Sequence, residues 1–149
     1  MEQPETAKNA TLLWITAIAA GILETVLAVS EIAMESGIDA GVWMNIGLRS
    51  VVYIGAFVLV GFFARGRRWA RLSLFALLSV IGLAAMVVPS AMQIADGESL
   101  IGAVGGDGRF ALAFFVIRLL HIAAVLLATG LMFSRGANAY FRKSELATA

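Results

Sequence analysis

The feature that most constrains this chain is the gathering of its apolar residues into four blocks. The blocks cover residues 11–34, 41–64, 69–95 and 110–133. A helix rises about 1.5 Å per residue, so each block can cross a hydrocarbon core of about 30 Å. Backbone groups in lipid must bond internally, and the residue alternation of a β-barrel is absent. The sequence therefore predicts an all-α membrane protein whose four transmembrane helices form an up-down bundle, a single domain over residues 1–149.

Charge in the connecting segments predicts the orientation of this bundle. The segment RGRRWAR, residues 65–71, joins the second and third blocks, and further basic residues follow the fourth block. The opposite side is acidic apart from Arg109. Cytoplasmic loops carry an excess of Lys and Arg, so we expect both termini in the cytoplasm and the protein in the cell membrane. The loop 96–109 then lies outside, and the tail 134–149 lies inside.

Two groups of residues are expected at the membrane surfaces. Aromatic side chains at helix ends favour the interface, and the candidates are Trp14, Trp43, Trp69 and Tyr140. The arginines of the RGRRWAR segment are expected chiefly to set topology, and alternatively to attract anionic lipid headgroups. These residues are Arg65, Arg67, Arg68 and Arg71.

Composition excludes several functional classes. The chain has no Cys, which removes disulfides and thiolate metal sites, and its single His argues against a zinc or bis-histidine haem centre. A formal net charge of +1 gives no field directed at nucleic acid. No nucleotide motif and no Ser–His–Asp order is visible, although a lone His with a Glu can serve lipid chemistry. We therefore expect no cofactor and no metal, and the sequence favours a protein that is not an enzyme.

Ionisable residues inside the apolar blocks are the main functional lead. Glu24 and Glu31 lie two helical turns apart on one face of the first block. Arg49, Arg118 and His121 come from the second and fourth blocks, at a depth of roughly 12–18 Å below the outer helix ends. An isolated charge at the bilayer centre costs about 2.5–3.5 kcal/mol or more. We therefore expect both carboxylates to face both guanidinium groups, with His121 alongside. Asn45 and Tyr53 share the stripe of Arg49 and complete the candidate network.

Three interpretations of this polar layer stay open. The layer can be structural and lock the register of the helices. It can line an outward-facing pocket that binds a ligand or relays protons. It can also contact partner subunits, since a chain this short encloses little volume of its own and a homo-oligomer or larger membrane complex is plausible.

Two resemblances accompany these patterns. GRRWAR before the third block and SRGANAYFR after the fourth resemble segments of a loose group of small four-helix membrane proteins from actinobacteria. This resemblance covers the second half of the chain and implies the four-helix fold without any catalytic residue. AGILETV, residues 20–26, resembles the first helix of small multidrug resistance transporters, in which a membrane-embedded Glu exchanges protons for cationic drugs. It implies that Glu24 is such an acid, but Arg49, Arg118 and the long outer loop depart from that family.

The leading hypothesis is a non-enzymatic integral membrane protein, either an accessory subunit or a module that binds a small anionic or lipid ligand in the bilayer. In this hypothesis Arg49 and Arg118 hold an anionic or carbonyl group, with Glu24 and Glu31 as counterions. The alternative is a small proton-coupled transporter in which Glu24 is the coupling acid.

Overall fold

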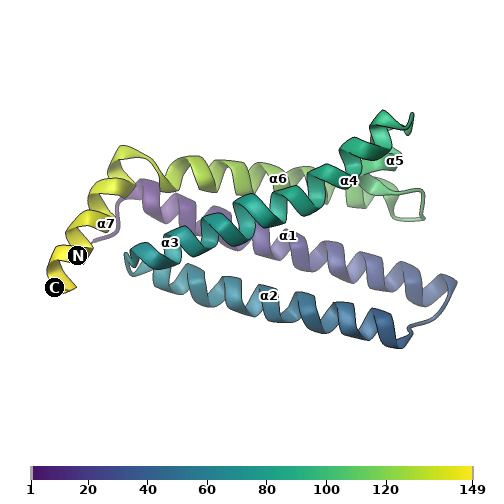
Figure 1. The fold of residues 1–149 in the computed structure, drawn as a ribbon, viewed down its shortest axis with the longest axis horizontal. Helices are drawn as coiled ribbons and strands as arrows, with labels where there is room; N and C mark the ends of the chain where they lie inside the picture. Colours follow the sequence, from purple (N-terminus) through teal and green to yellow (C-terminus); the bar gives the residue numbers. More distant parts are fainter. Residues whose placement is uncertain (1, 149) are drawn as a thin grey trace.

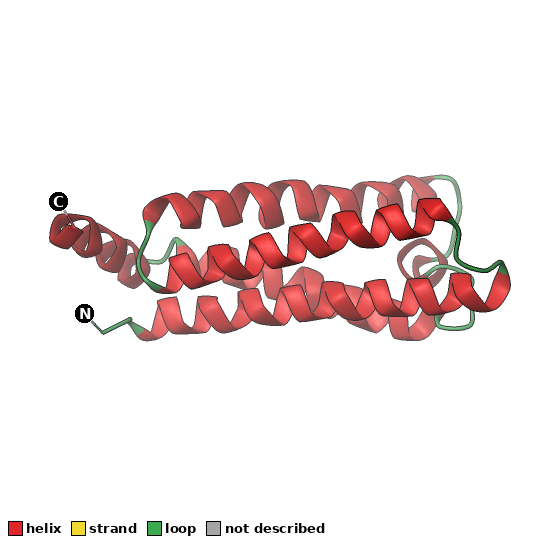
Figure 2. Ribbon diagram, turned by 90° about the horizontal axis from the view of Figure 1, so that it is seen from below, coloured by secondary structure: helices red, strands yellow, loops and turns green. Residues whose placement is uncertain are grey.

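The computed structural model describes residues 2–148, without the side chains of residues 145 and 148, as helices joined by short loops (Figure 2). The elements are α1 (Glu5–Glu35), α2 (Ala40–Ala64), α3 (Arg68–Leu74), the π-helix η1 (Phe75–Gly82), α4 (Leu83–Ala95), α5 (Leu100–Gly105), α6 (Ala111–Met132) and α7 (Arg135–Thr148). The prediction of an all-α chain is confirmed over these residues.

Within residues 2–148, four segments are long and apolar enough to cross a membrane, which confirms the number of predicted spans. They are α1, α2, the continuous run of α3, η1 and α4 (Arg68–Ala95), and α6. Three of them agree with the predicted bounds to within two residues. The first begins at Glu5, six residues earlier than expected, because the carbonyl of Pro4 accepts from the backbone N–H groups of Ala7 and Lys8 at 2.9 and 3.0 Å.

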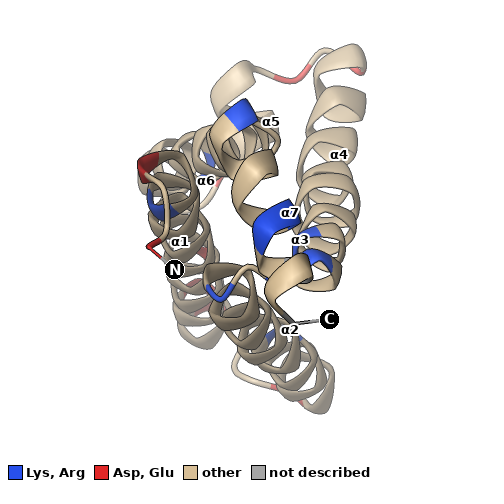
Figure 3. Cartoon of the chain, turned by 90° about the vertical axis from the view of Figure 1, so that its left-hand side faces the viewer, with Lys and Arg blue, Asp and Glu red and all other residues tan. Residues whose placement is uncertain are grey.

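The chain ends and the loops lie at two opposite ends of the bundle (Figure 1). The N- and C-termini, the turn 65–67 and α7 lie at the end that we call the basic end. The loop 36–39, α5 and the loop 106–110 lie at the other, which we call the acidic end. Seen from the basic end, Lys and Arg segments gather on α7, on α3 and on the turn before it (Figure 3).

The densest packing lies toward the basic end. Small residues along α1, including Ala10 and Ala17, are fully buried and allow α6 to pack closely against this helix. The largest fully buried side chains are Trp14, Phe63, Leu74, Val125, Met132 and Phe141. The expected position of Trp14 at a helix end is wrong, because α1 begins at Glu5 and this side chain is fully buried in the core. Trp43 and Trp69 are more than half exposed, and their interfacial position stays a prediction.

Residues 135–148, which were expected only as a tail, form the helix α7, which packs against the basic end of the bundle. The Tyr140 hydroxyl donates to the carbonyl oxygen of Ala64 at 2.9 Å, and the Phe141 and Phe63 rings lie 5.0 Å apart. Tyr140 is 8% exposed, so its side chain packs against the protein instead of facing lipid or water. Burial raises the pKa of Tyr140, so that the phenol stays protonated and can keep donating this hydrogen bond.

Arg71 holds α7 from the side of the third span. Its guanidinium donates to Asn138 Oδ1 at 2.6 Å and lies 4.4 Å above the Phe133 ring. The Arg71 side chain is buried against α7, which contradicts headgroup contact, the alternative role considered for this arginine. Arg65, Arg67 and Arg68 are exposed around it and stay candidates for topology or headgroup contact.

The third span is the least buried of the four. Its middle segment, η1, is a π-helix, which the sequence did not predict. A 2.7 Å hydrogen bond between Ser79 and Thr129 joins η1 to α6. Short π-helical segments often mark functional positions. Beyond η1, every residue of α4 except Ser90 is exposed or half-buried, and two cavities lie between this span and the other helices.

Candidate ligand site within the bundle

Glu24 is the centre of the polar layer. Its Oε2 accepts from Arg118 Nη2 at 3.1 Å and from Nε at 3.3 Å. Its Oε1 lies 3.1 Å from His121 Nδ1. A carboxylate only accepts, so this geometry requires a proton on Nδ1 and leaves Nε2 of a neutral His121 as an acceptor. Glu24 is 5% exposed, and each of its oxygens is therefore paired in a buried position.

Tyr53 joins α2 to α1 next to this layer. Its hydroxyl donates to the Gly21 carbonyl at 2.7 Å and lies 2.9 Å from Thr25 Oγ1. Gly21 permits this approach, because a Cβ at this position would meet the Tyr53 ring at 3.1 Å and the His121 ring at 3.2 Å. The small residue on α1 thus allows the Tyr53 and His121 rings to approach this helix closely.

Arg49 does not join the ion pair. Its Nε donates to Asn45 Oδ1, one turn earlier on α2, at 2.8 Å, and both side chains are exposed. Within residues 2–148, no carboxylate lies within 4.0 Å of its guanidinium. A guanidinium carries five N–H donors, so most of the donors of Arg49 are open to another acceptor.

Glu31 also departs from the expected pairing, and it contacts a loop instead of an arginine. Its carboxylate lies directly against Gly108, and its Oε1 is 3.5 Å from the backbone N–H of Phe110, which donates. α6 begins at Ala111, and a negative charge near the first turn of a helix is favourable. The two turns that separate Glu31 from Glu24 carry it beyond the layer to the acidic end.

An inner cavity of about 300 Å³ adjoins the polar layer. Its polar lining comes from five residues that the sequence singled out, and its remaining wall is mainly apolar side chains of α1, η1 and α4. The polar residues are Glu24, Arg49, Tyr53, Arg118 and His121. Arg49 also lines a groove of about 490 Å³ between α1 and α2, together with Asn45.

Several residues of this site carried no signal in the sequence. Leu77, Leu78 and Ile81 of η1 line the inner cavity, but they are ordinary apolar residues of a transmembrane segment. Val104 contributes only its backbone carbonyl, which accepts from Arg118 Nη1 at 3.1 Å. Thr25 could have been found, because it follows Glu24 and is polar within an apolar block.

The fold and this site define the class of protein: a small all-helical membrane protein with four candidate spanning helices and a polar layer between them. Within residues 2–148, no group of three or more His, Asp or Glu side chains is placed to hold a metal ion. No protein-family model matches the chain, and neither a curated protein nor a solved structure matches it.

Proposed function

We propose that this protein is a non-enzymatic integral membrane module that binds a small amphipathic molecule in its inner cavity. The molecule places a hydrogen-bond acceptor, a carbonyl or an anionic group, against Arg49. Its apolar part lies against the side chains of η1 and α4. The observation that carries this proposal is a cavity with one polar side, which includes an arginine without a carboxylate partner.

Volume and charge both support this assignment. About 300 Å³ is at the lower limit of the about 300–1,000 Å³ typical of small-molecule sites, so it suits a small ligand or one end of a lipid. The Glu24 carboxylate is already paired with Arg118 and His121. Arg49 is left with a positive charge within the span, and a bound acceptor would offset the cost of that charge.

The proposed setting is the cell membrane, with the spans arranged up and down and the basic end in the cytoplasm. Arg65, Arg67 and Arg68 are exposed at the basic end, and Asp39, Asp96 and Glu98 are exposed at the acidic end. This distribution supports an orientation that follows the preference of Lys and Arg for the cytoplasmic side.

Purification in mild detergent followed by native mass spectrometry tests the proposed function. We expect the wild-type chain to carry a bound species, and Arg49→Ala to lower its occupancy at least about tenfold, since a hydrogen bond to a charged group is lost. Arg135→Ala is the matched control, because Arg135 is exposed at the basic end and should leave occupancy unchanged. A wild-type chain without bound species, or equal occupancy in both variants, would contradict the proposal. The same spectra report copies or partner subunits that accompany the chain.

A second candidate, proton-coupled transport, is favoured by the direct contact of Glu24 with His121 beside the inner cavity. Proton uptake by Glu24 would release its hold on Arg118 and His121. With Glu24 as the coupling acid, Glu24→Gln abolishes pH-driven flux in vesicles loaded with a candidate substrate, while Glu35→Gln at the exposed end of α1 preserves it. Unchanged flux in Glu24→Gln would remove this candidate.

A further inference from the structure

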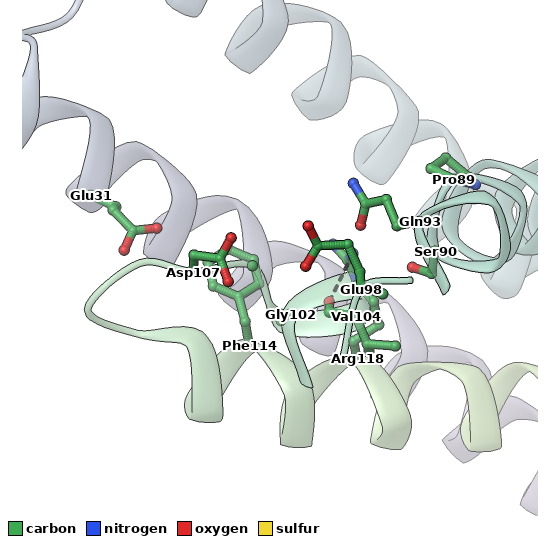
Figure 4. A pocket seen from close by; sticks show the side chains of 13 residues that line it. Glu31, Pro89, Ser90, Gln93, Glu98, Gly102, Val104, Asp107, Phe114 and Arg118 are labelled. Carbon is green, nitrogen blue, oxygen red and sulfur yellow. Dashed lines mark hydrogen bonds between the residues drawn. The ribbon is translucent and has the colours of Figure 1, made fainter. Parts of the chain in front are cut away.

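A second cavity lies beside the inner one, at the acidic end of the bundle. This cavity, the vestibule, has a volume of about 350 Å³ and lies among α1, α4, α5 and α6. Three carboxylates line it, and Figure 4 shows their side chains together with Gln93 and Ser90 of α4 and Arg118 of α6. The carboxylates belong to Glu31, Glu98 and Asp107.

Arg118 is the one described residue that lines both cavities. Its Nε and Nη2 donate to Glu24, beside the inner cavity, and its Nη1 donates to the Val104 carbonyl of α5, beside the vestibule. The same guanidinium therefore borders both spaces and ties α5 to the polar layer. A side chain held by three hydrogen bonds can act as a closed barrier that moves only when these bonds break.

Toward the basic end, the inner cavity meets the core. Ala17 and Ile18 form its wall on α1, and the fully buried Trp14 follows one turn nearer to the basic end. Phe63, Leu74 and Met132 continue this packed region. Close packing of this kind leaves no passage for water or a solute toward the basic end.

We propose that the inner cavity is filled from water at the acidic end, through the vestibule, and that the Arg118 side chain is the barrier between them. The proposal rests on the ligand site proposed above and narrows its ligand class. Carboxylates around the entrance repel anions, so the ligand is a small water-soluble molecule that bears a carbonyl acceptor and no net negative charge.

Substituted cysteines provide the test, because the natural chain contains none. Ser90→Cys reports on the vestibule, and Met86→Cys, one turn along α4, reports on the inner cavity. Arg135→Cys marks the basic side, and Val88→Cys is an exposed apolar control on the same helix. Each variant is reconstituted in vesicles and treated from either side with membrane-impermeant thiosulfonate reagents, one cationic and one anionic.

With Arg118 in place, we expect Ser90→Cys to react only from the side opposite Arg135→Cys, and faster with the cationic reagent. Met86→Cys should be protected from both sides, as should Val88→Cys. Combining Met86→Cys with Arg118→Ala should raise its labelling rate from the acidic side at least about tenfold, because the charge-assisted bonds that hold the barrier are gone. Glu24→Gln should raise the same rate by a smaller factor, and it serves if Arg118→Ala does not fold.

Three results would overturn the proposal. The first is labelling of Ser90→Cys only from the side of Arg135→Cys, or from neither side. The second is rapid labelling of Met86→Cys while Arg118 is intact. The third is an unchanged rate for Met86→Cys in both Arg118→Ala and Glu24→Gln. These measurements need no ligand. The proposed access route can therefore be disproved while the mass spectra still show a bound species. The ligand site can likewise be disproved while the labelling results agree with the route.

Discussion

Glu24 is the residue of α1 that accepts the side-chain hydrogen bonds from α6 in the polar layer. It is buried, and it accepts from Arg118 through Oε2 and from His121 through Oε1. A buried ion pair is worth little in total, because both charges lose their hydration. Removing one partner is much more costly, because the other charge is then left unpaired. The Glu24–Arg118 pair therefore acts mainly by disfavouring other arrangements of α1 and α6. The loss of stability on substituting one of these residues should depend on whether the other is present.

A double-mutant cycle tests this dependence. Arg118→Ala should lower the free energy of unfolding in detergent by about 1–3 kcal/mol, because it leaves the Glu24 carboxylate without its main donor. Combining Arg118→Ala with Glu24→Ala should lower it no further, since no buried charge is left over. Denaturant titration or thermal unfolding measures both. Arg135→Ala, on the exposed surface of α7, should change stability by less than about 0.5 kcal/mol. Additive losses from the two substitutions would show that the side chains act independently.

At the scale of elements, α7 is docked by contacts from two different spans. The Ala64 carbonyl at the end of α2 accepts from Tyr140, and Arg71 of α3 donates to Asn138. The turn between these spans approaches α7 at Gly66, which has a φ of +76°. A Cβ at Gly66 would lie 2.6 Å from Ser144 Oγ and 2.8 Å from Ser144 Cβ. The turn therefore needs glycine both for its backbone conformation and for the contact with α7.

Two glycine substitutions separate these causes. Gly66→Ala and Gly37→Ala both place a side chain at positive φ, but a Cβ at Gly37 (φ +80°) meets nothing within 4 Å. Each should lose about 1 kcal/mol from backbone strain. Gly66→Ala should lose more, and protease cleavage within α7 should accelerate, because the helix must move away from the turn. Equal losses and equal cleavage rates would show that α7 does not press on Gly66.

The whole molecule is asymmetric along its long axis. The packed core lies toward the basic end, and the vestibule lies toward the acidic end, where all residues of α4 except Ser90 are exposed or half-buried. The exposed charges follow the same axis, with arginines prevailing at one end and carboxylates at the other. A molecule closed toward one side and hollow toward the other is suited to exchange with one aqueous compartment. The side on which Arg135→Cys reacts reports which compartment that is.

The sequence alone was sufficient for the helical class and the four spans, because apolar blocks of this length have few other stable structures in a bilayer. It also selected Glu24, Arg118 and His121, which the structure brings into contact, since a buried charge needs a partner. Only the tertiary structure shows the environments of the other candidate residues, because these environments depend on contacts with neighbouring side chains and helices. Arg49 bonds to Asn45, Glu31 contacts the loop before α6, and Arg71 and Trp14 are buried by α7 and the core. Depth along a helix can be counted from the sequence, but the direction of a side chain and the cover above it depend on how the helices pack.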